Sequence, residues 1–174
     1  MTQEDGASFE EQILSVPYFD NLSLLKNIEE RIKSREELSS LINKSKNAQG
    51  QPFLYLLCYK AAWDIINYIL DLEDINLDIS VVTDKDGDSC IHGLLQYIIE
   101  EQDMELGKYI LENLIECGFD ISIKNKQNLT PLDYYLQKNG GKADEIVDLL
   151  ISAGFNGGEE QGDEGQEVDE LDED

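Results

Sequence analysis

Basic residues are scarce in this 174-residue chain, where 13 Lys and Arg stand against 38 Asp and Glu and give a net charge of −25. Residues 157–174 hold ten of these carboxylates and no base, which leaves −15 on the rest of the chain. Because contact with phosphate groups needs a basic patch, this balance argues against direct binding to nucleic acid or to anionic lipid. The acidity instead favours a basic partner, or serves solubility alone.

Histidine and cysteine are also rare. The single histidine, His92, leaves too few ligands and bases for most metal and acid–base sites. The three cysteines, Cys58, Cys90 and Cys117, lie 32 and 27 residues apart, which fits neither a disulfide framework nor a zinc knuckle. We expect all three to be small buried hydrophobes, rather than redox or nucleophilic groups, in a reducing compartment such as the cytoplasm or nucleus.

Membrane spans and phosphate or calcium loops are missing as well. The longest apolar run, residues 53–58, has six residues, far short of the roughly 18–20 of a membrane span. The acidic N-terminal stretch MTQEDGASFEEQ lacks the features of a signal peptide. DKDGD at 84–88 lacks the terminal glutamate of a calcium loop, and GGK at 140–142 lacks the spacing of a phosphate loop. We therefore expect no enzyme, no cofactor and no bound metal.

Apolar residues recur at helical spacing in short segments joined by polar stretches. Alternation of the strand type is scarce, and only residues 77–82 could form a strand. The pattern therefore predicts an almost entirely helical, single-domain chain. The segments are 9–16, 22–32, 38–42, 53–59, 65–70, 91–99, 106–115, 131–136 and 146–151.

Two internal repeats stand out. NLIECGFD at 113–120 aligns with LLISAGFN at 149–156, where an aliphatic pair ends a helix and a glycine able to adopt the left-handed conformation stops it. NLTPLD at 128–133 is related to GDSCIH at 87–92 and GQPFLY at 50–55. In this hexad Ser89 and Thr130 predict helix N-caps, Pro131 suits the first helical position, and Gly50 and Gly87 predict tight turns. Asn128 occupies the glycine position of the third copy.

These motifs resemble the ankyrin-repeat family, with its turn, its G-x-T-P-L-H-x-A helix start, and its second helix ending in an aliphatic pair and glycine. The resemblance implies an all-α ankyrin-repeat solenoid of about four helix–turn–helix units over residues 8–156, with residues 8–43 as a degenerate N-terminal capping unit. Residues 157–174 are predicted to be a disordered acidic tail. The chain is similar in this respect to small stand-alone ankyrin proteins of fungi.

The unit spacing departs from the family pattern. The hexads lie 37 and 41 residues apart, against about 33 in the family. We expect insertions near residues 97–105 and 139–141 that lengthen helices or the loops between them. Within this register His92 is expected to be a structural residue, hydrogen-bonded to Ser89 and to a neighbouring turn.

An ankyrin solenoid binds proteins through its turn tips and first helices, so the resemblance implies a set of partner-binding residues. Trp63 is added as an aromatic residue that either packs against the preceding unit or anchors a partner. The turn tips are Ala48, Gln49, Gln51, Lys85, Asp86, Asp88, Lys126, Gln127 and Leu129, and the first helices contribute Tyr59, Lys60, Gln96, Tyr97, Gln137 and Lys138.

The predicted function is non-enzymatic protein binding by a monomer, and two hypotheses remain open. In the first, the chain is an escort, or chaperone, for a basic protein such as a ribosomal protein or histone, and the tail helps to shield that partner's charge. In the second, it is a generic scaffold or regulatory adaptor whose tail serves solubility only. The salt dependence of partner binding distinguishes the two hypotheses.

Overall fold

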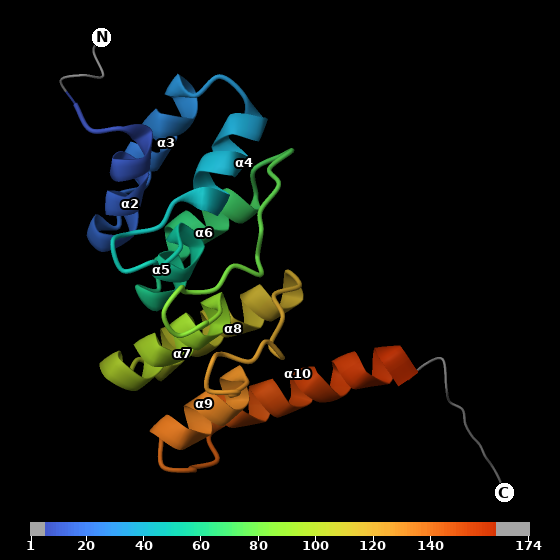
Figure 1. Ribbon diagram of the computed structural model, residues 1–174. Helices are drawn as coiled ribbons and strands as arrows, with labels where there is room; N and C mark the ends of the chain where they lie inside the picture. The colour runs from blue at the N-terminus through green and yellow to red at the C-terminus, as the bar shows by residue number, and fades with distance from the viewer. Residues whose placement is uncertain (1–5, 163–174) are drawn as a thin grey trace, which may run out of the picture.

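The computed structural model describes the backbone of residues 6–162 and, within it, the side chains of residues 6–155. In this part of the chain the regular secondary structure is α-helical, with two isolated β-bridges, so the all-α prediction is confirmed (Figure 1). The helices are α2 (Phe9–Phe19), α3 (Leu22–Arg31), α4 (Arg35–Lys44), α5 (Phe53–Tyr59), α6 (Trp63–Leu70), α7 (Cys90–Glu101), α8 (Met104–Glu116), α9 (Pro131–Lys138) and α10 (Glu145–Gly162).

The N-terminal unit contains three helices, α2, α3 and α4, rather than one pair. Each begins after a polar residue, Ser8, Asn21 or Ser34, whose side chain accepts a hydrogen bond from a backbone N–H of the first turn. Helices α2 and α4 both contact α5. Because α5 is apolar on nearly every side, this contact buries a face that the repeats alone would leave open.

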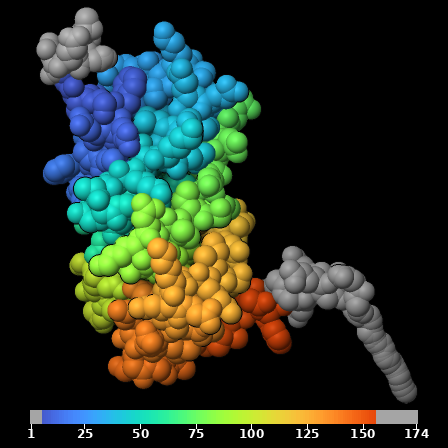
Figure 2. Space-filling model, in the orientation of Figure 1, coloured from blue at the N-terminus to red at the C-terminus, as the bar shows by residue number. Residues whose placement is uncertain are grey.

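The remaining helices form three pairs, α5–α6, α7–α8 and α9–α10, whose first helices stack on one another. In the space-filling view the colours follow in sequence from one end to the other (Figure 2), as expected when each unit packs mainly on its neighbours. One continuous core of buried aliphatic side chains runs through the units.

The predicted helix starts and turns are confirmed. Ser89 and Thr130 each form a capping box with the third helical residue, and Pro131 is the first residue of α9. Gly50, Gly87 and Asn128 adopt left-handed φ angles of 77°, 70° and 67°. Asparagine replaces glycine in the third turn because its short side chain tolerates this conformation better than most residues do.

The extra residues of the third unit lengthen its helices. Helix α7 has 12 residues and α8 has 13, against 7 in α5 and 8 in α6. The extra residues of the fourth unit instead form the loop at 139–144, in which Gly140 and Gly141 both have left-handed φ angles. Both insertions leave the stack of first helices intact.

The repeated glycines end up in different conformations. Gly118 follows α8 with a φ of 94° and turns the chain, as predicted, whereas Gly154 lies inside α10, which continues to Gly162. The difference follows from the next residue, because Phe119 is 6% exposed and Phe155 is 70% exposed. Among the described residues, Phe155 has no core to turn back into, and the helix continues.

Helix α10 continues to Gly162, so it includes the first six residues of the predicted acidic tail, 157–162. The rest of that predicted segment, residues 163–174, lies outside the described residues.

Residues 77–82 form a loop rather than a strand. The preceding stretch of this loop is held to α4 by side chains of that helix. Asn43 donates to the carbonyl oxygen of Asn76 over 2.8 Å and accepts from the backbone N–H of Asp78, and the Ser39 hydroxyl accepts from the N–H of Asn76. The side chains of α4 thus satisfy backbone groups that would otherwise need the neighbouring strand of a β-sheet as their partner.

Candidate protein-binding surface

Three turns project side by side from the starts of α5, α7 and α9. Each is closed by a backbone hydrogen bond across its base, from Asn47 to Gln51, from Thr83 to Asp88 and from Asn125 to Leu129, with N···O distances of 2.9–3.0 Å. Two of them also carry an isolated antiparallel bridge, Lys46 with Pro52 and Val82 with Ser89. The turn tips are thus built as short hairpins.

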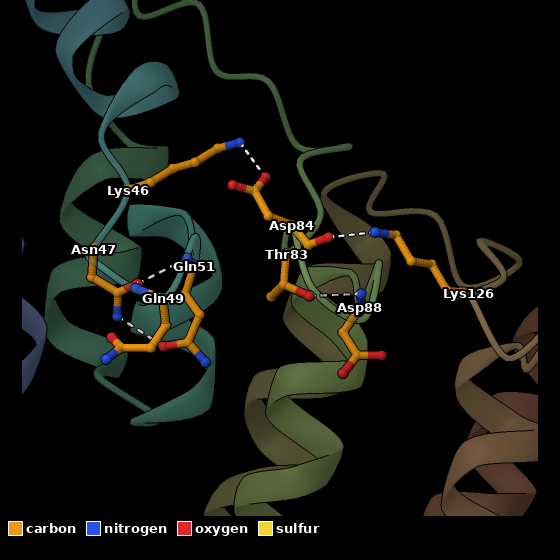
Figure 3. Close-up of polar contacts among 8 residues, drawn as sticks. All are labelled: Lys46, Asn47, Gln49, Gln51, Thr83, Asp84, Asp88 and Lys126. Carbon is orange, nitrogen blue, oxygen red and sulfur yellow. Dashed lines mark hydrogen bonds and ion pairs between the residues drawn. The ribbon is translucent and has the colours of Figure 1, made fainter.

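The tips are also bonded to one another, largely through Asp84 of the middle turn (Figure 3). Its carboxylate lies 2.7 Å from the Lys46 ammonium, and its N–H donates to the carbonyl oxygen of Gly50 over 3.0 Å. On the other side the Lys126 ammonium donates to the Asp84 carbonyl oxygen, and the Lys126 N–H donates to that of Asp86 over 2.8 Å. The three tips therefore form one connected surface.

Two asparagines organise the outer turns, and the sequence reasoning missed them. The Asn47 side-chain oxygen accepts from the N–H groups of Gln49 and Gln51, and the Asn125 oxygen accepts in the same way from Gln127 and Leu129. In both turns this asparagine stands three residues before the residue with left-handed φ. Aligning NAQG at 47–50 with NKQN at 125–128 would have found it.

Most predicted tip residues are on the surface. Ala48, Gln49, Lys85, Asp86, Lys126 and Gln127 are exposed. Gln51 is half-buried and accepts from the Asn47 amide, and Leu129 is half-buried with its carbonyl oxygen bonded to His92. These two residues support the turns more than they face a partner.

Asp88 is the one predicted tip residue that the structure places inside. It is 8% exposed, and its carboxylate accepts from the Asn125 amide over 2.9 Å. Its own N–H donates to the Thr83 hydroxyl over 3.0 Å. Asp88 is therefore a structural link between adjacent turns, because both its carboxylate and its backbone N–H are bonded within the fold.

The first helices present a row of tyrosines and lysines. The Tyr59 hydroxyl donates to Glu100 over 3.0 Å, and the Tyr134 hydroxyl donates to Gln96. The ammonium of Lys60 lies over the ring of Tyr59 at 5.4 Å. Tyr59 and Gln96, both predicted, are thus each hydrogen-bonded to a residue of the neighbouring unit, Glu100 and Tyr134 respectively.

Three further predicted residues differ in their exposure. Gln137 and Lys138 are exposed on α9, and Lys138 lies over the Tyr134 ring at 5.3 Å. Tyr97 is half-buried and its hydroxyl donates to Asp103 over 2.9 Å, so it closes the α7–α8 turn. Burial and this hydrogen bond raise the pKa of Tyr97 to about 12.

Tyr18 of the N-terminal unit extends the tyrosine row and was not predicted. It is 46% exposed, lies under the Lys60 ammonium at 5.1 Å and accepts a hydrogen bond from Asn47. No motif marks it, because it lies outside the repeats. Only the stacking of α2 on α5 brings it to this surface.

Charge is divided unevenly between the two layers of helices. The tips and first helices carry five exposed lysines among their acids: Lys46, Lys60, Lys85, Lys126 and Lys138. Among the residues whose side chains are described, the second helices α6, α8 and α10 together contain six acids and a single base, Lys108. The strongest negative charge of the described part is thus on the second-helix side.

Trp63 lies at the start of a second helix, away from the tips. Its ring meets that of Tyr109 edge to face, with centroids 5.3 Å apart. Tyr109 belongs to α8 of the following unit, so this ring contact joins Trp63 to the next unit along the chain. Trp63 also packs, half-buried, on the core.

His92 has the structural role predicted for it. It is 0% exposed, its Nδ1 accepts from the Ser89 N–H over 3.0 Å, and its Nε2 lies 3.0 Å from the Leu129 carbonyl oxygen. Burial lowers the pKa of His92, partly offset by the hydrogen bond to Leu129. The histidine therefore ties the start of α7 to the next turn.

The cysteines follow the expectation in two positions out of three. Cys58 and Cys90 are buried, whereas Cys117 is exposed. Cys117 caps the C-terminus of α8, one turn beyond the last fully buried residue Leu114, and Gly118 turns the chain at the surface. Its hydrophobic character is not enough to bury a residue at a helix end.

In the described part of the chain, His, Cys, Asp and Glu form no group of three with the proximity a metal ion requires. None of the helices in that part combines the length and apolar character of a membrane-crossing segment.

Comparison with known proteins found one informative relative. An ankyrin repeat-containing protein of Saccharomyces cerevisiae is 34% identical in an alignment of 172 residues that covers 95% of this chain and 92% of the relative. No family model matches the chain. Because the match covers 95% of the chain, it includes most of the N-terminal unit of three helices as well as the repeats.

Proposed function

The chain belongs to the ankyrin-repeat family, which makes it a protein–protein interaction module, and we propose that its partner is a basic protein that it escorts. The proposal places a ribosomal protein or histone, in the cytoplasm or nucleus, against a monomer of this non-enzymatic chain. The observation that carries it is the charge of −25, of which ten charges lie in residues 157–174. The negative charge attracts a positively charged partner, which speeds its association, and it keeps the complex with that partner soluble.

The connected turn tips and the tyrosine row support a role as the main contact surface. The tips are cross-linked by Asp84, so presenting them costs little ordering entropy on binding. Tyr18 and Tyr59 offer aromatic area with hydroxyl groups, which is the composition that protein interfaces favour.

The alternative, a generic adaptor with a tail that serves solubility only, is favoured by the lysines of the same surface. Five exposed lysines make the tips and first helices a mixed rather than a purely acidic face. Such a face also fits a neutral partner held by apolar and hydrogen-bonding contacts.

The experiment begins with a tagged pull-down and mass spectrometry, followed by association kinetics of the purified partner at two ionic strengths. Because Gly162 is the last described residue of α10, the comparison is between the full chain and residues 1–162. An escort requires fast association that slows steeply with salt, and a shallower salt dependence in the shortened chain. Equal rates and equal salt slopes for both chains would favour the adaptor.

A second comparison tests the surface. Gln49→Ala combined with Gln127→Ala removes two exposed tip side chains, while Lys124→Ala combined with Glu116→Ala changes exposed positions off the tips. We expect the tip pair to speed dissociation severalfold and the control pair to leave it unchanged, with equal melting temperatures for both. Equal dissociation rates in the two variants would contradict the assignment of the tips.

A further inference from the structure

We propose that the outer groove between α8 and α10 binds an arginine- or lysine-bearing segment of a protein partner. This groove is separate from the turn tips and first helices, and it has a volume of about 380 Å³. It is lined by Met104, Glu105, Lys108, Tyr109, Glu112 and Glu145. The inference depends on the proposed function only for the basic character of the partner.

The spacing along α8 places an aromatic ring between two carboxylates. Glu105, Tyr109 and Glu112 are four and three residues apart, so they form one stripe along the helix. All three are exposed, Tyr109 to 49%. A cation seated on the ring would therefore have a carboxylate one turn away on either side.

These two carboxylates are free to take a cation from outside. Lys108, the one base among the residues that line the groove, forms an ion pair with Glu145, with 3.6 Å between its ammonium nitrogen and a carboxylate oxygen. Among the side chains that the structure describes, no lysine or arginine forms an ion pair with Glu105 or Glu112. The groove thus keeps a net negative charge after its internal pairing.

The ring of Tyr109 is available in the same way. Some tyrosines of the chain already have a lysine over the ring, as Tyr18, Tyr68 and Tyr134 do at 5.1–5.3 Å. Within the described residues, Tyr109 has no such cation. Its contact with Trp63 fixes the ring in place, so an incoming guanidinium or ammonium meets an ordered aromatic face.

Charge complementarity selects the occupant. A second copy of this chain would bring a net charge of −25 to an acidic groove, and nucleic acid would bring phosphates, so both are disfavoured. A basic segment satisfies the carboxylates through its head groups, while its methylene stems lie on Met104 and Tyr109. The small volume fits a few side chains, which makes the groove an auxiliary contact beside the main surface.

The only tryptophan of the chain, Trp63, reports directly on this groove, since its ring lies 5.3 Å from that of Tyr109. The experiment titrates the full-length chain with an oligo-arginine peptide that carries no aromatic residue, and follows Trp63 emission. We expect a saturable change in emission that is lost at high salt. Binding detected by calorimetry with no change in Trp63 emission would place the peptide elsewhere and overturn the proposal.

A matched pair of variants separates the groove from the overall charge. Glu105→Gln with Glu112→Gln removes the two groove carboxylates, and Glu30→Gln with Glu36→Gln removes two exposed carboxylates from the N-terminal unit. Both changes alter the net charge equally. We expect the groove pair to weaken peptide binding about three- to tenfold and the control pair to change it little. Equal weakening in the two variants would mean that only the net charge attracts the peptide.

Folding is checked for each variant by its melting temperature, and Tyr109→Leu gives a second measurement that keeps the apolar packing. We expect Tyr109→Leu to bind the peptide more weakly, which would support a contact between the peptide and the ring. An unchanged affinity would contradict that contact. Failure of these tests leaves the salt dependence of the natural partner unaffected, so failure of the groove and failure of the proposed function are distinguishable.

Discussion

At the scale of single residues, the protonation state of His92 is set by its hydrogen bonds. Nδ1 accepts from the Ser89 N–H, so it carries no proton, and Nε2–H is left to donate to the Leu129 carbonyl oxygen. A second proton on Nδ1 would remove the first of these bonds. The neutral ring is also the form that burial favours, although the nearby Asp88 acts in the opposite direction.

The first prediction concerns the pH dependence of stability. Because the pKa of His92 is lowered in the folded chain, the unfolded chain binds its proton more readily as the pH falls below the ordinary value of 6.5. The contribution of His92 is therefore complete above that pH and decreases below it. We expect His92→Gln to lower the free energy of unfolding by about 1–3 kcal/mol at neutral pH, and by less in mild acid.

Urea unfolding of the original chain and of His92→Gln, at pH values above and below 6.5, measures the difference between their free energies of unfolding. A difference in unfolding free energy that stays constant or widens in acid would contradict the inference that the folded chain holds the His92 ring in its neutral form. Partner binding by the folded variant should remain close to that of the original chain, because His92 is 0% exposed.

The second prediction compares the two phenylalanines of the repeated motif. Phe119 is 6% exposed and its N–H donates to the Leu114 carbonyl oxygen, whereas Phe155 is 70% exposed. We expect Phe119→Ala to cost about 3–5 kcal/mol of unfolding free energy and Phe155→Ala to cost under about 0.5 kcal/mol. Denaturant melts of the two variants check this, and similar losses would mean that Phe155 has a packing partner.

At the scale of elements, the turns depend on how closely neighbouring units approach. A Cβ at Gly50 would lie 2.6 Å from the Cβ of Asp84, the residue that joins the three tips. Gly140 has almost the same φ, 78° against 77°, but an added Cβ there meets nothing within 4 Å. A comparison of substitutions at Gly50 and Gly140 therefore distinguishes the cost of backbone strain, which both share, from the cost of the contact with Asp84, which only Gly50 has.

The third prediction uses this matched pair. Gly140→Ala should cost about 1–2 kcal/mol, because alanine resists the left-handed conformation. Gly50→Ala should cost about 1–3 kcal/mol more, since Asp84 must move away from Lys46 as well. Thermal or urea unfolding of the two variants measures the difference, and equal losses would show that the contact between the turns adds nothing to stability.

At the scale of the whole molecule, the chain combines a continuous apolar core with a strong excess of negative charge. The core passes through the units from the N-terminal helices to α10, and no lysine or arginine is buried among the residues whose side chains are described. Apart from the buried Asp88, the acids whose side chains are described are exposed or half-buried, where they repel one another in the folded chain. Salt screens this repulsion, with a screening length of about 10 Å at 0.1 M.

The fourth prediction follows from this balance. Raising the sodium chloride concentration should raise the melting temperature of the full chain, because the folded form holds the charge of −25 in a smaller volume than the unfolded form does. The increase should be smaller for residues 1–162, which lack eight of the carboxylates. Melting curves at low and moderate salt test this, and a melting temperature that falls with salt would contradict it.

Local features of this fold were predictable because they depend on residues close together in the sequence. The caps at Ser89 and Thr130, and the left-handed turns at Gly50 and Asn128, each arise from interactions within a few residues. The stack of units followed from the recurrence of these signals. The exposed tip residues were predictable for the same reason, since they lie next to the turn signals.

The remaining features were decided by the tertiary structure. Gly118 and Gly154 stand in the same motif, yet one turns the chain and the other extends a helix, because only the first is followed by a core for its phenylalanine. Asp88 is buried by a contact with Asn125, 37 residues away, and Tyr109 is brought to Trp63 by the packing of the second helices. Such contacts join distant segments, so composition and spacing determine which residues can form a turn or helix, while packing determines which side chains remain at the surface.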